Sequence, residues 1–383
     1  MTLLAQPAPP IVSPEVHPDR SVTFRFQDPN AKQVFLSREG AEKVAMTKDD
    51  QGLWSVTTAP LDPDRYSYTF QADGVSLMDP HNSLITPNLL GSASAVRVPG
   101  TPPQLWEVAD VPRGVVHHHF YKSGIIGDQR DYYVYTPPAY NPKAKPYPVL
   151  YLLHGFSDAA NGWTAVGEAH VILDNLIAAG KVKPMVVVMP LGYGAPEILT
   201  GGWRRAGGDA TLWQRNKEKF RDALLTELMP RIEQEYRVSK DRKLRAITGL
   251  SMGGAESVMT GLNALDRFAW VGSFSAGGLD EDYNAAFPKL DAKANSQLKL
   301  LWIACGVDDG LIKPNRQFRD WLKSKDVKLT FVETPGTHCW MVWRRNLVTF
   351  ASLLFQDTKW IAPGRAIDRN FTLNSPYLPV ISR

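Results

Sequence analysis

The sequence lacks the features that are typical of membrane-spanning and nucleic-acid-binding proteins. No run of apolar residues approaches the roughly 18–20 residues that a membrane-spanning helix needs. Its 43 lysine and arginine residues nearly balance 39 aspartate and glutamate residues, which gives a formal net charge of +4 without a long basic block. A charge this small and this evenly spread gives no reason to expect nucleic acid as a partner. We therefore expect neither a membrane nor a nucleic acid among the partners.

Cysteine is scarce, with only Cys305 and Cys339 among 383 residues. Two cysteines do not by themselves decide the redox compartment. A disulfide is geometrically allowed if the strand that ends at Cys305 lies beside the strand that leads to Cys339. Two buried free thiols are the simpler interpretation.

The N-terminus lacks a positively charged segment, and its apolar stretch is too short for a signal peptide. Residues 4–6 (LAQ) are nevertheless typical of the neighbourhood of a cleavage site. The start therefore looks like the remnant of a trimmed signal. We expect a periplasmic or secreted protein whose proline-rich residues 1–14 are flexible.

No residue pattern indicates a cofactor or a metal. The glycine-rich residues 192–194 and 201–202 lack both the P-loop lysine and the dinucleotide-binding spacing. His117 and His119 would share one face of a strand, but no carboxylate or cysteine cluster accompanies them. We interpret residues 117–119 as a solvated strand and expect no cofactor and no metal.

Residues 15–100 have the pattern of a small all-β domain. Residues 22–26 (VTFRF) alternate apolar and polar side chains, and turn signals separate this segment from similar ones. Short strands at this spacing are typical of a β-sandwich. The proline- and glycine-rich cluster 99–103 (PGTPP) then indicates a linker over residues 101–112. The further strands are expected at residues 32–37, 53–57, 66–70 and 95–98.

Residues 113–383 have the pattern of an α/β protein. Residues 149–153 (VLYLL) and 185–189 (MVVVM) are continuous apolar runs, as expected of strands that are buried on both faces. Residues 166–179 and 220–236 have helical spacing. Strands that alternate with helices predict a mostly parallel sheet with helices on both faces.

The segment 249–254 (GLSMGG) is the strongest functional signal. It follows an expected buried strand, 243–248, and precedes an expected helix. G-x-S-x-G between a strand and a helix is the nucleophile elbow, a turn so tight that Gly249 and Gly253 cannot carry side chains. The hydroxyl of Ser251 is then exposed above the edge of the sheet. We predict that Ser251 is a catalytic nucleophile.

A serine nucleophile needs a base, and the base needs a carboxylate to orient it. In this architecture the acid and then the histidine follow the serine along the chain. His338 is the only histidine downstream of Ser251, so we predict that it is the base. The acid should come from the loop after the expected strand 298–304, where Asp308 and Asp309 compete. Asp309 is favoured, and Asp308 remains the alternative.

The oxyanion that forms during attack needs two backbone N–H donors. Met252 N–H should be one of them, because it follows the nucleophile at the start of a helix. Phe156 N–H should be the other, from the loop after strand 149–153. In the same loop His154 is expected to brace the backbone and Asp158 to make structural hydrogen bonds. Tyr193 and Trp203 are candidate substrate contacts near the mouth of the site, with simple packing of their loop as the alternative. Trp343 is a further candidate, either as a wall of the pocket or as a core residue.

Residues 113–358 resemble the carbohydrate esterase family of feruloyl and acetylxylan esterases, which has relatives among enterochelin esterases and mycolyltransferases. The resemblance implies Ser251 as nucleophile, His338 as base and Asp309 as acid. It also implies Met252 and Phe156 as oxyanion donors. Residues 15–100 resemble the immunoglobulin-like, glycogen-binding-type module, in which Trp54 is expected to be a core residue. The motifs that carry these resemblances are residues 153–155 with Asp158 and Trp163, residues 249–254, residues 305–306 with Asp309, His338 with Trp343, and residues 52–54 and 79–82.

The resemblance implies an α/β-hydrolase that removes feruloyl or acetyl groups from plant cell-wall polysaccharide such as xylan. Its substrate partner would be a polysaccharide ester or a hydroxycinnamate ester. The alternatives are an esterase for siderophores or other small esters, and an acyltransferase on the same fold. A sugar-binding protein with a decayed hydrolase domain is a third class, but the intact set of serine, aspartate and histidine argues against it.

Overall fold

A computed structural model describes residues 10–202, 209–279, 282–356 and 380–381. Its contacts divide the chain into two compact units, Met1–Gln104 and Leu105–Arg383. The division falls inside the segment 101–112, which the sequence predicts to be a linker. Trp106 packs in the core of the larger unit, so the later part of this segment belongs to that unit.

The smaller unit is all β, with two antiparallel sheets. One sheet has the order β1-β2-β6-β5, and the other has the order β4-β3-β7-β10-β9 with β8 paired to β7. The strands are β1 Glu15–Val16, β2 Val22–Gln27, β3 Val34–Arg38, β4 Val44–Ala45, β5 Thr47–Lys48, β6 Leu53–Thr57, β7 Asp64–Ala72, β8 Val75–Leu77, β9 Ile85–Thr86 and β10 Ala93–Val98.

Aromatic side chains join the two sheets of the smaller unit. Phe24 on β2 meets Tyr68 on β7 edge to face, with ring centroids 4.7 Å apart. Trp54 is buried and its Nε1–H donates to Asp28 O at 2.8 Å, so it lies in the core as the sequence predicts. The alternating pattern therefore builds a sandwich with its apolar faces turned inward.

The last residues of segment 1–14, which the sequence predicts to be flexible, are anchored to the smaller unit. Residues 1–9 lie outside the described part of the chain, but Ser13 is buried and donates to Asp79 Oδ2 at 2.6 Å. The backbone carbonyl of Val12 accepts from the Arg25 guanidinium at 2.7 Å. The predicted flexibility therefore does not extend to residues 12–14.

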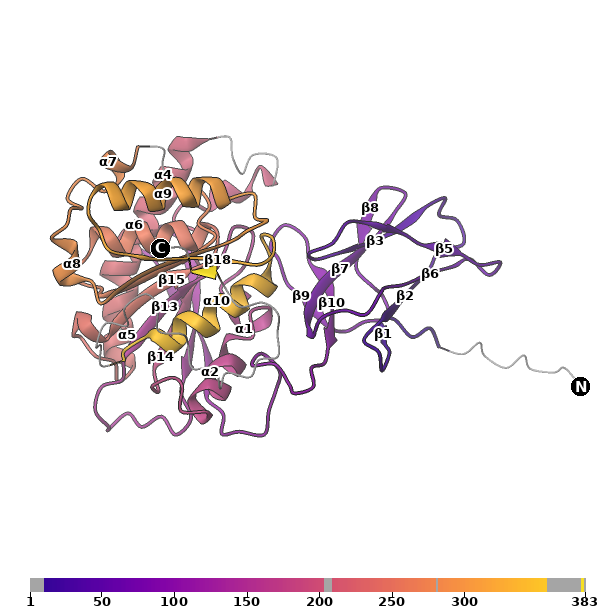
Figure 1. The fold of residues 1–383 in the computed structure, drawn as a ribbon, viewed down its shortest axis with the longest axis horizontal. Coiled ribbons are helices and arrows are strands. Elements are labelled where there is room, and N and C mark those ends of the chain that lie inside the picture. Colours follow the sequence, from indigo (N-terminus) through magenta and orange to yellow (C-terminus); the bar gives the residue numbers. More distant parts are fainter. Residues whose placement is uncertain (1–9, 203–208, 280–281, 357–379, 382–383) are drawn as a thin grey trace, which may run out of the picture. The chain divides into compact units, whose positions relative to one another are not determined.

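Within the described residues of the larger unit, nine strands form one sheet in the order β11-β12-β14-β13-β15-β16-β17-β18-β19 (Figure 1). The strands from β14 to β18 in that order pair in parallel. Strands β11, β12 and β19 pair antiparallel, so the sheet is mostly parallel, as predicted. The strands are β11 Val115–Lys122, β12 Gln129–Thr136, β13 Val149–Leu153, β14 Val186–Pro190, β15 Arg245–Gly249, β16 Trp270–Phe274, β17 Leu300–Gly306, β18 Thr330–Thr334 and β19 Val380–Ile381.

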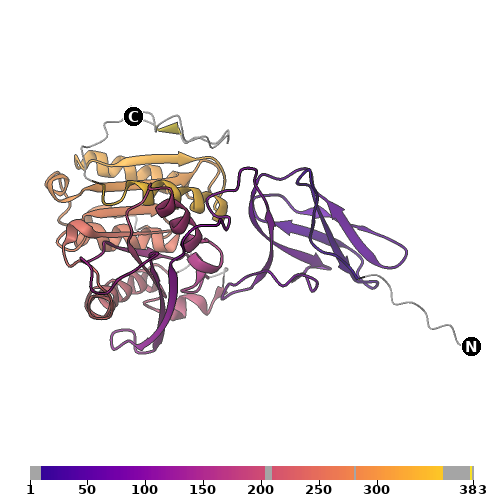
Figure 2. The ribbon, with the colours of Figure 1, turned by 90° about the horizontal axis from the view of Figure 1, so that it is seen from below.

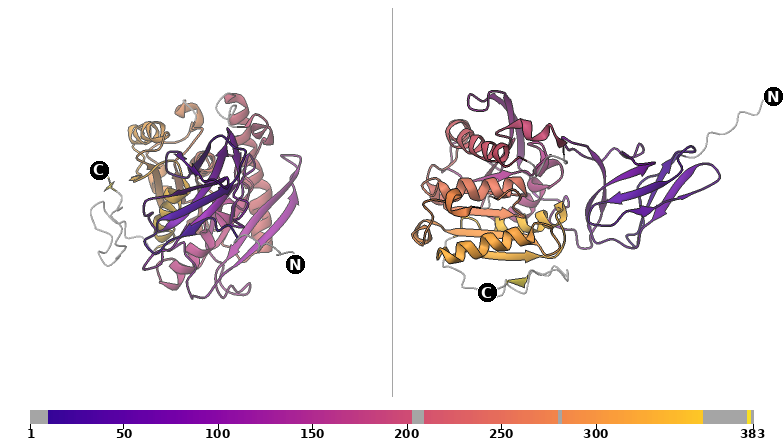
Figure 3. Two further views of the ribbon diagram at one scale, coloured as in Figure 1. Left: turned by 90° about the vertical axis from the view of Figure 1, so that its right-hand side faces the viewer. Right: turned by 90° about the horizontal axis from the view of Figure 1, so that it is seen from above.

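Helices cover both faces of this sheet, as Figures 2 and 3 show. Helices α2 and α10 pack with Leu150 and Leu152 on one face, while α4, α5, α6 and α9 pack with Val149, Tyr151 and Leu153 on the other. The continuous apolar run 149–153 is thus explained by burial on both sides. The helices are α1 Gly162–Ala165, α2 Ala169–Ala178, η1 Pro196–Leu199, α4 Ala210–Ala223, η2 Leu224–Leu228, α5 Met229–Glu235, η3 Arg242–Leu244, α6 Met252–Asn263, α7 Tyr283–Ala286, α8 Ala294–Gln297, α9 Ile312–Ser324 and α10 Trp340–Leu353.

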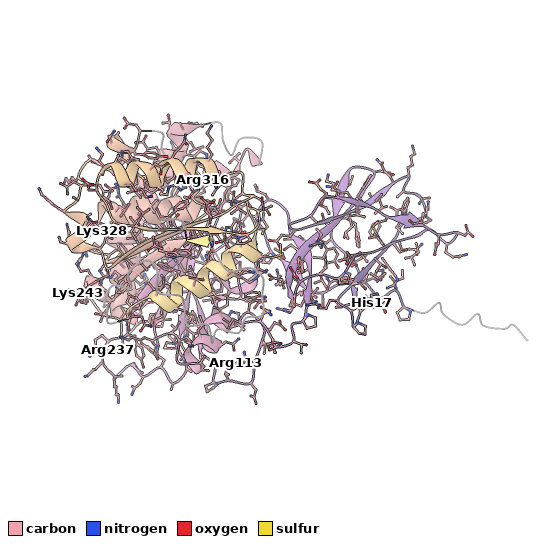
Figure 4. All side chains as sticks on the ribbon, in the orientation of Figure 1. His17, Arg113, Arg237, Lys243, Arg316 and Lys328 are labelled. Atoms are coloured by element: carbon pink, nitrogen blue, oxygen red, sulfur yellow. The ribbon has the colours of Figure 1, made fainter. Side chains whose placement is uncertain are left out.

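The basic side chains of the larger unit are dispersed, as expected from the small net charge of the sequence. Basic side chains come from separate segments of the unit, as the labels on Arg113, Arg237, Lys243, Arg316 and Lys328 in Figure 4 illustrate. Arg316 is neutralised by Glu333, with its Nη2 atom 2.7 Å from Oε2. Among the helices of the described residues, none is long and apolar enough to cross a membrane.

The central strand β13 offers a test of this core. Leu152 is fully buried, so Leu152→Ala should lower the free energy of unfolding by about 2–5 kcal/mol through lost contacts and the cavity left behind. Urea unfolding followed by tryptophan fluorescence measures the change. Val108→Ala is the control, because Val108 is 68% exposed and its truncation should alter stability by less than about 0.5 kcal/mol. Equal effects of the two substitutions would contradict the assigned core.

Candidate active site

Ser251 lies between β15 and α6 with a strained backbone, at φ 50° and ψ −116°. Residues with a side chain avoid this region unless their surroundings fix them there. Phe274 O accepts from Ser251 N at 2.9 Å, and Ser251 O accepts from Gly277 N at 2.9 Å. The turn is therefore held from both sides by the last residue of the neighbouring strand β16 and by the segment that follows it.

The two glycines of the turn are required by close backbone contacts. A Cβ atom on Gly249 would lie 2.6 Å from Gly253 O. A Cβ atom on Gly253 would lie 2.4 Å from His154 O. The elbow therefore packs directly against the loop that follows β13, and only glycine fits at these two positions.

His338 and Asp309 lie in line with the Ser251 hydroxyl. His338, between β18 and α10, places Nε2 3.0 Å from Ser251 Oγ. Its Nδ1 lies 2.8 Å from Asp309 Oδ2, in the loop after β17. With Nδ1–H donating to the carboxylate, Nε2 is left to accept the hydroxyl proton. The three residues named from the order of the chain are thus brought together in a hydrogen-bonded series.

The Asp309 carboxylate is buried, and hydrogen bonds from protein groups replace those that water would make. Burial opposes its charged form, yet hydrogen bonds and charge from His338, with further hydrogen bonds from Leu311 N and Ser275, keep its pKa below the usual value. Leu311 N donates to Oδ1 at 2.8 Å. Asp308 is exposed and its N–H donates to Gly336 O, so Asp309 is the neighbour that meets the imidazole.

The expected oxyanion donors come from segments that flank Ser251. Met252 is the first residue of α6, where the helix dipole favours negative charge. The loop after β13 lies against the elbow, because a Cβ atom on Gly155 would be 3.4 Å from Ser251 Cβ and 2.5 Å from Leu250 Cδ1. Phe156, whose N–H is the other expected donor, is the residue after Gly155. Donation to an oxyanion by these two groups stays a prediction.

His154 braces that loop. Its Nδ1–H donates to Gly155 O at 2.8 Å, and its Nε2 accepts from Gly192 N at 2.8 Å. This pairing requires the neutral ring with the proton on Nδ1. Complete burial lowers the pKa of His154 to about 4, which keeps the ring neutral. Asp158 contributes through Oδ2, which accepts from Gly155 N at 3.3 Å.

Two of the candidate substrate contacts, Tyr193 and Trp343, are buried. Tyr193 is only 1% exposed and its hydroxyl donates to Asp158 O at 2.7 Å, so it supports the loop and does not face a ligand. Trp343 is buried and meets His338 edge to face, with ring centroids 4.8 Å apart. It therefore supports the base from the core side. Trp203 lies outside the described residues.

Trp213 and Gly277 escaped the sequence analysis. Trp213 on α4 is half-buried, and its ring centroid lies 5.6 Å from that of Phe156. A Cβ atom on Gly277 would lie 3.2 Å from Ser251 Oγ, so the absence of a side chain there leaves room beside the nucleophile. The glycine pair 277–278, shortly after the end of β16, is a signal that the sequence analysis could have used. Trp213 carries no such signal, because it sits in an ordinary helical pattern.

Both cysteines are buried and free, so the simpler interpretation holds. Burial and the neighbouring Asp309 carboxylate raise the pKa of Cys305 to about 12. Such a thiol stays protonated and unreactive at neutral pH. The Cys305 side chain therefore contributes a weak hydrogen-bond donor next to the site.

The three consecutive histidines have protein partners. His118 Nε2 lies 2.8 Å from Asp131 Oδ2, and His119 Nε2 lies 2.5 Å from the Tyr236 hydroxyl. His117 Nε2 lies 3.2 Å from Thr136 Oγ1. In the part of the chain that the structure describes, no group of three or more His, Cys, Asp or Glu side chains could hold a metal ion.

Comparison with known proteins identifies related esterases. A family model described as "Putative esterase" matches residues 123–352. An endo-1,4-beta-xylanase/feruloyl esterase from Xylanibacter ruminicola is 30% identical over 90% of this chain, although the chain spans only 46% of that protein. An acetyl esterase from Caldicellulosiruptor saccharolyticus is 22% identical over 52% of this chain and 79% of that protein.

Solved structures share the fold. A ferulic acid esterase is 26% identical, covers 63% of this chain and 98% of its own, and superposes with a TM-score of 0.53. The enterobactin esterase from Shigella flexneri, solved in the presence of enterobactin, has 19% identity and a TM-score of 0.64. It covers 87% of this chain and 92% of its own, which at this identity is a likeness of fold.

The buried neutral His154 predicts a pH dependence of stability. As the pH falls from about 6.5, the unfolded chain binds a proton at this residue, whereas the folded protein resists doing so until about pH 4. Stability from this residue is therefore lost across that range, by about 3 kcal/mol in total.

Comparison with His154→Gln isolates this contribution. The variant should be less stable at pH 7, because it loses one of the two bracing hydrogen bonds. Urea unfolding at several pH values should show the wild type losing about 3 kcal/mol relative to the variant between pH 7 and pH 4, so that the variant becomes the more stable protein at the acid end. A difference that stays constant with pH would contradict a neutral His154.

Proposed function

Because this chain belongs to the esterase family whose model matches residues 123–352, we propose that it hydrolyses carboxylic esters with Ser251 as the nucleophile. The observation that carries the proposal is the hydrogen-bonded series from Asp309 through His338 to Ser251, at 2.8 and 3.0 Å. These distances are within reach of direct proton transfer between nucleophile and base.

Acylation follows from this geometry. Ser251 Oγ bonds to the carbonyl carbon of the ester while its proton moves to His338 Nε2. The Asp309 carboxylate stabilises the imidazolium, and the new oxyanion accepts hydrogen bonds from Met252 N–H and Phe156 N–H. When the oxyanion collapses, the ester C–O bond breaks. His338 returns its proton to the departing alcohol oxygen, which leaves the acyl group on Ser251.

Deacylation repeats these steps with water. His338 Nε2 removes a proton from a water molecule whose oxygen bonds to the acyl carbon. The second oxyanion collapses, the bond to Ser251 Oγ breaks, and Oγ regains the proton from His338. The products are the free carboxylic acid and the restored enzyme.

The substrate that we propose is a feruloyl or acetyl ester of plant cell-wall polysaccharide such as xylan, with a sugar hydroxyl as the leaving alcohol. Similarity to an endo-1,4-beta-xylanase/feruloyl esterase along 90% of the chain supports this choice. Trp213, which is half-buried and packs against Phe156, is the aromatic side chain that we propose for contact with a planar hydroxycinnamoyl group. A polymeric substrate outside the cell accords with a periplasmic or secreted location.

The smaller unit has a separate proposed identity. We propose that residues 15–100 are an immunoglobulin-like module of the glycogen-binding type, on the strength of its sequence motifs and its sandwich of antiparallel strands. Trp54 belongs to its core, so that tryptophan offers no sugar platform.

The adjacent aspartates provide a matched test of the mechanism. Asp309→Asn should lower kcat by about 10³–10⁴, because the amide no longer holds the imidazole in its working tautomer or stabilises its charge. Asp308→Asn, one residue away and exposed, should stay within about twofold of wild type. Hydrolysis of p-nitrophenyl acetate measures both variants. Ser251→Ala supplies the background rate, and the proposal is wrong if that variant keeps wild-type turnover.

A panel of esters tests the substrate. Methyl ferulate and acetylated xylan should both be turned over, with kcat/KM for methyl ferulate above that for p-nitrophenyl acetate if the Phe156–Trp213 surface binds the acyl group. Trp213→Ala should lower kcat/KM for methyl ferulate by about tenfold and leave acetate hydrolysis nearly unchanged. Preferential hydrolysis of a catecholate siderophore ester would replace the plant-wall substrate with the second candidate. Acyl transfer to an added alcohol in preference to water would indicate a transferase.

A further inference from the structure

Two consecutive glycines, Gly277 and Gly278, lie beside the nucleophile, and we call them the glycine strip. A Cβ atom on Gly277 would lie 3.2 Å from Ser251 Oγ, and one on Gly278 would lie 3.8 Å from Trp213 Cε3. The strip therefore leads from the reactive oxygen to the ring of Trp213. Gly278 is exposed, and Gly277, Ser251 and Trp213 are half-buried, so all four residues reach the surface of the protein.

Backbone conformation explains only one of the two glycines. Gly278 has φ 81°, a conformation that glycine adopts without strain. Gly277 does not have a positive φ, so its backbone does not require glycine. A Cβ atom on Gly277 would nevertheless lie 3.1 Å from Leu311 Cδ1 as well as close to Ser251 Oγ. Leu311 therefore lies at the serine end of the strip, as Trp213 lies at the far end.

Two helices hold the strip and its apolar neighbours in the same way. Lys217 lies one turn after Trp213 on α4, and its Nζ donates to Gly278 O at 3.1 Å. Asn315 lies one turn after Leu311, the N-cap residue of α9, and its Nδ2 donates at 3.0 Å to the carbonyl of the residue before the strip. Both polar side chains are buried. Each helix thus places an apolar side chain beside the strip and ties it to the strip's backbone.

We propose that the glycine strip between Leu311 and Trp213 is the acyl-binding surface and takes flat arylpropenoyl groups, an assignment that rests on the proposed ester hydrolysis. Consecutive Cα atoms lie about 3.8 Å apart, so an acetyl group on the serine ends near Gly277. An arylpropenoyl group extends past Gly278 to Trp213. Bare peptide offers it a flat face, and the two apolar side chains add contacts along its length.

The wild-type enzyme tests the preference for flat groups. Methyl dihydroferulate has the same ring as methyl ferulate but a saturated, flexible linker. The value of kcat/KM for methyl ferulate should be the higher by about tenfold or more, because the conjugated group loses less torsional freedom when it lies along the strip. Conjugation makes its carbonyl the less electrophilic, so this preference reports binding. Equal values for the two esters would overturn the proposal.

Gly278→Ala covers the far end of the strip. The added methyl group would lie in the path of the aryl ring and beyond the reach of an acetyl group. The ratio of kcat/KM for methyl ferulate to that for p-nitrophenyl acetate should therefore fall about tenfold or more. An unchanged ratio would overturn the proposal.

Gly180→Ala is the matched control. Gly180 also has a positive φ, at 66°, and an added Cβ atom would meet nothing within 4 Å. Both variants should therefore carry similar backbone strain and show a similar fall in melting temperature. Only Gly278→Ala should change the ratio, and an equal change in Gly180→Ala would overturn the proposal.

Leu311→Ala is a second variant that introduces no strained backbone conformation. It removes apolar contact at the serine end of the strip, so the preference for methyl ferulate over methyl dihydroferulate should fall about three- to tenfold. If Gly278→Ala does not fold, this variant decides the matter, and an undiminished preference would overturn the proposal.

A comparison of alcohols separates the acyl group from the leaving group. His338 must return its proton to the departing alcohol, so we expect the alcohol on the side of the base. Gly278→Ala should hydrolyse methyl acetate and butyl acetate in the wild-type ratio, and a loss that follows the alcohol would overturn the assignment. Absence of Ser251-dependent hydrolysis of p-nitrophenyl acetate would instead overturn the proposed function, whereas intact hydrolysis with unaltered acyl preference would overturn this inference alone.

Discussion

The site depends on the strained backbone of Ser251. A residue with a side chain stays at this φ and ψ only where its surroundings over-determine it. The turn after β16 binds both ends of Ser251, and Gly249 and Gly253 allow the elbow to close against the loop after β13. These contacts come from three adjacent strands, so the conformation of one serine requires the centre of the sheet to be intact.

The same sheet explains why residues distant in sequence meet. The parallel strands β13, β15, β17 and β18 end at one edge, and the segments that follow them carry Phe156, Ser251, Asp309 and His338 respectively. Strand β16 lies between β15 and β17 and is followed by the segment that contains the glycine strip. An open parallel sheet therefore gathers a site from loops that are far apart along the chain.

Chain order and local motif were sufficient to predict the fold class and that His338 meets Ser251, because each has a strong local signal. The choice between Asp308 and Asp309 stayed open, since the direction of adjacent side chains on an irregular loop depends on contacts such as Leu311 N to Asp309 Oδ1. Tyr193 was assigned to the mouth from its loop position, whereas long-range packing buries it. The contact of Trp213 with Phe156 is a tertiary contact that no local pattern encodes.

The backbone and the side chain of Phe156 have different proposed roles. Its N–H is the proposed oxyanion donor, and any residue other than proline could supply that group. Its ring meets Trp213, which belongs to helix α4 and not to the strand ends that hold the catalytic residues. Under the proposed function, a substitution that alters either ring would change which acyl group binds and would leave the backbone donor of the oxyanion in place.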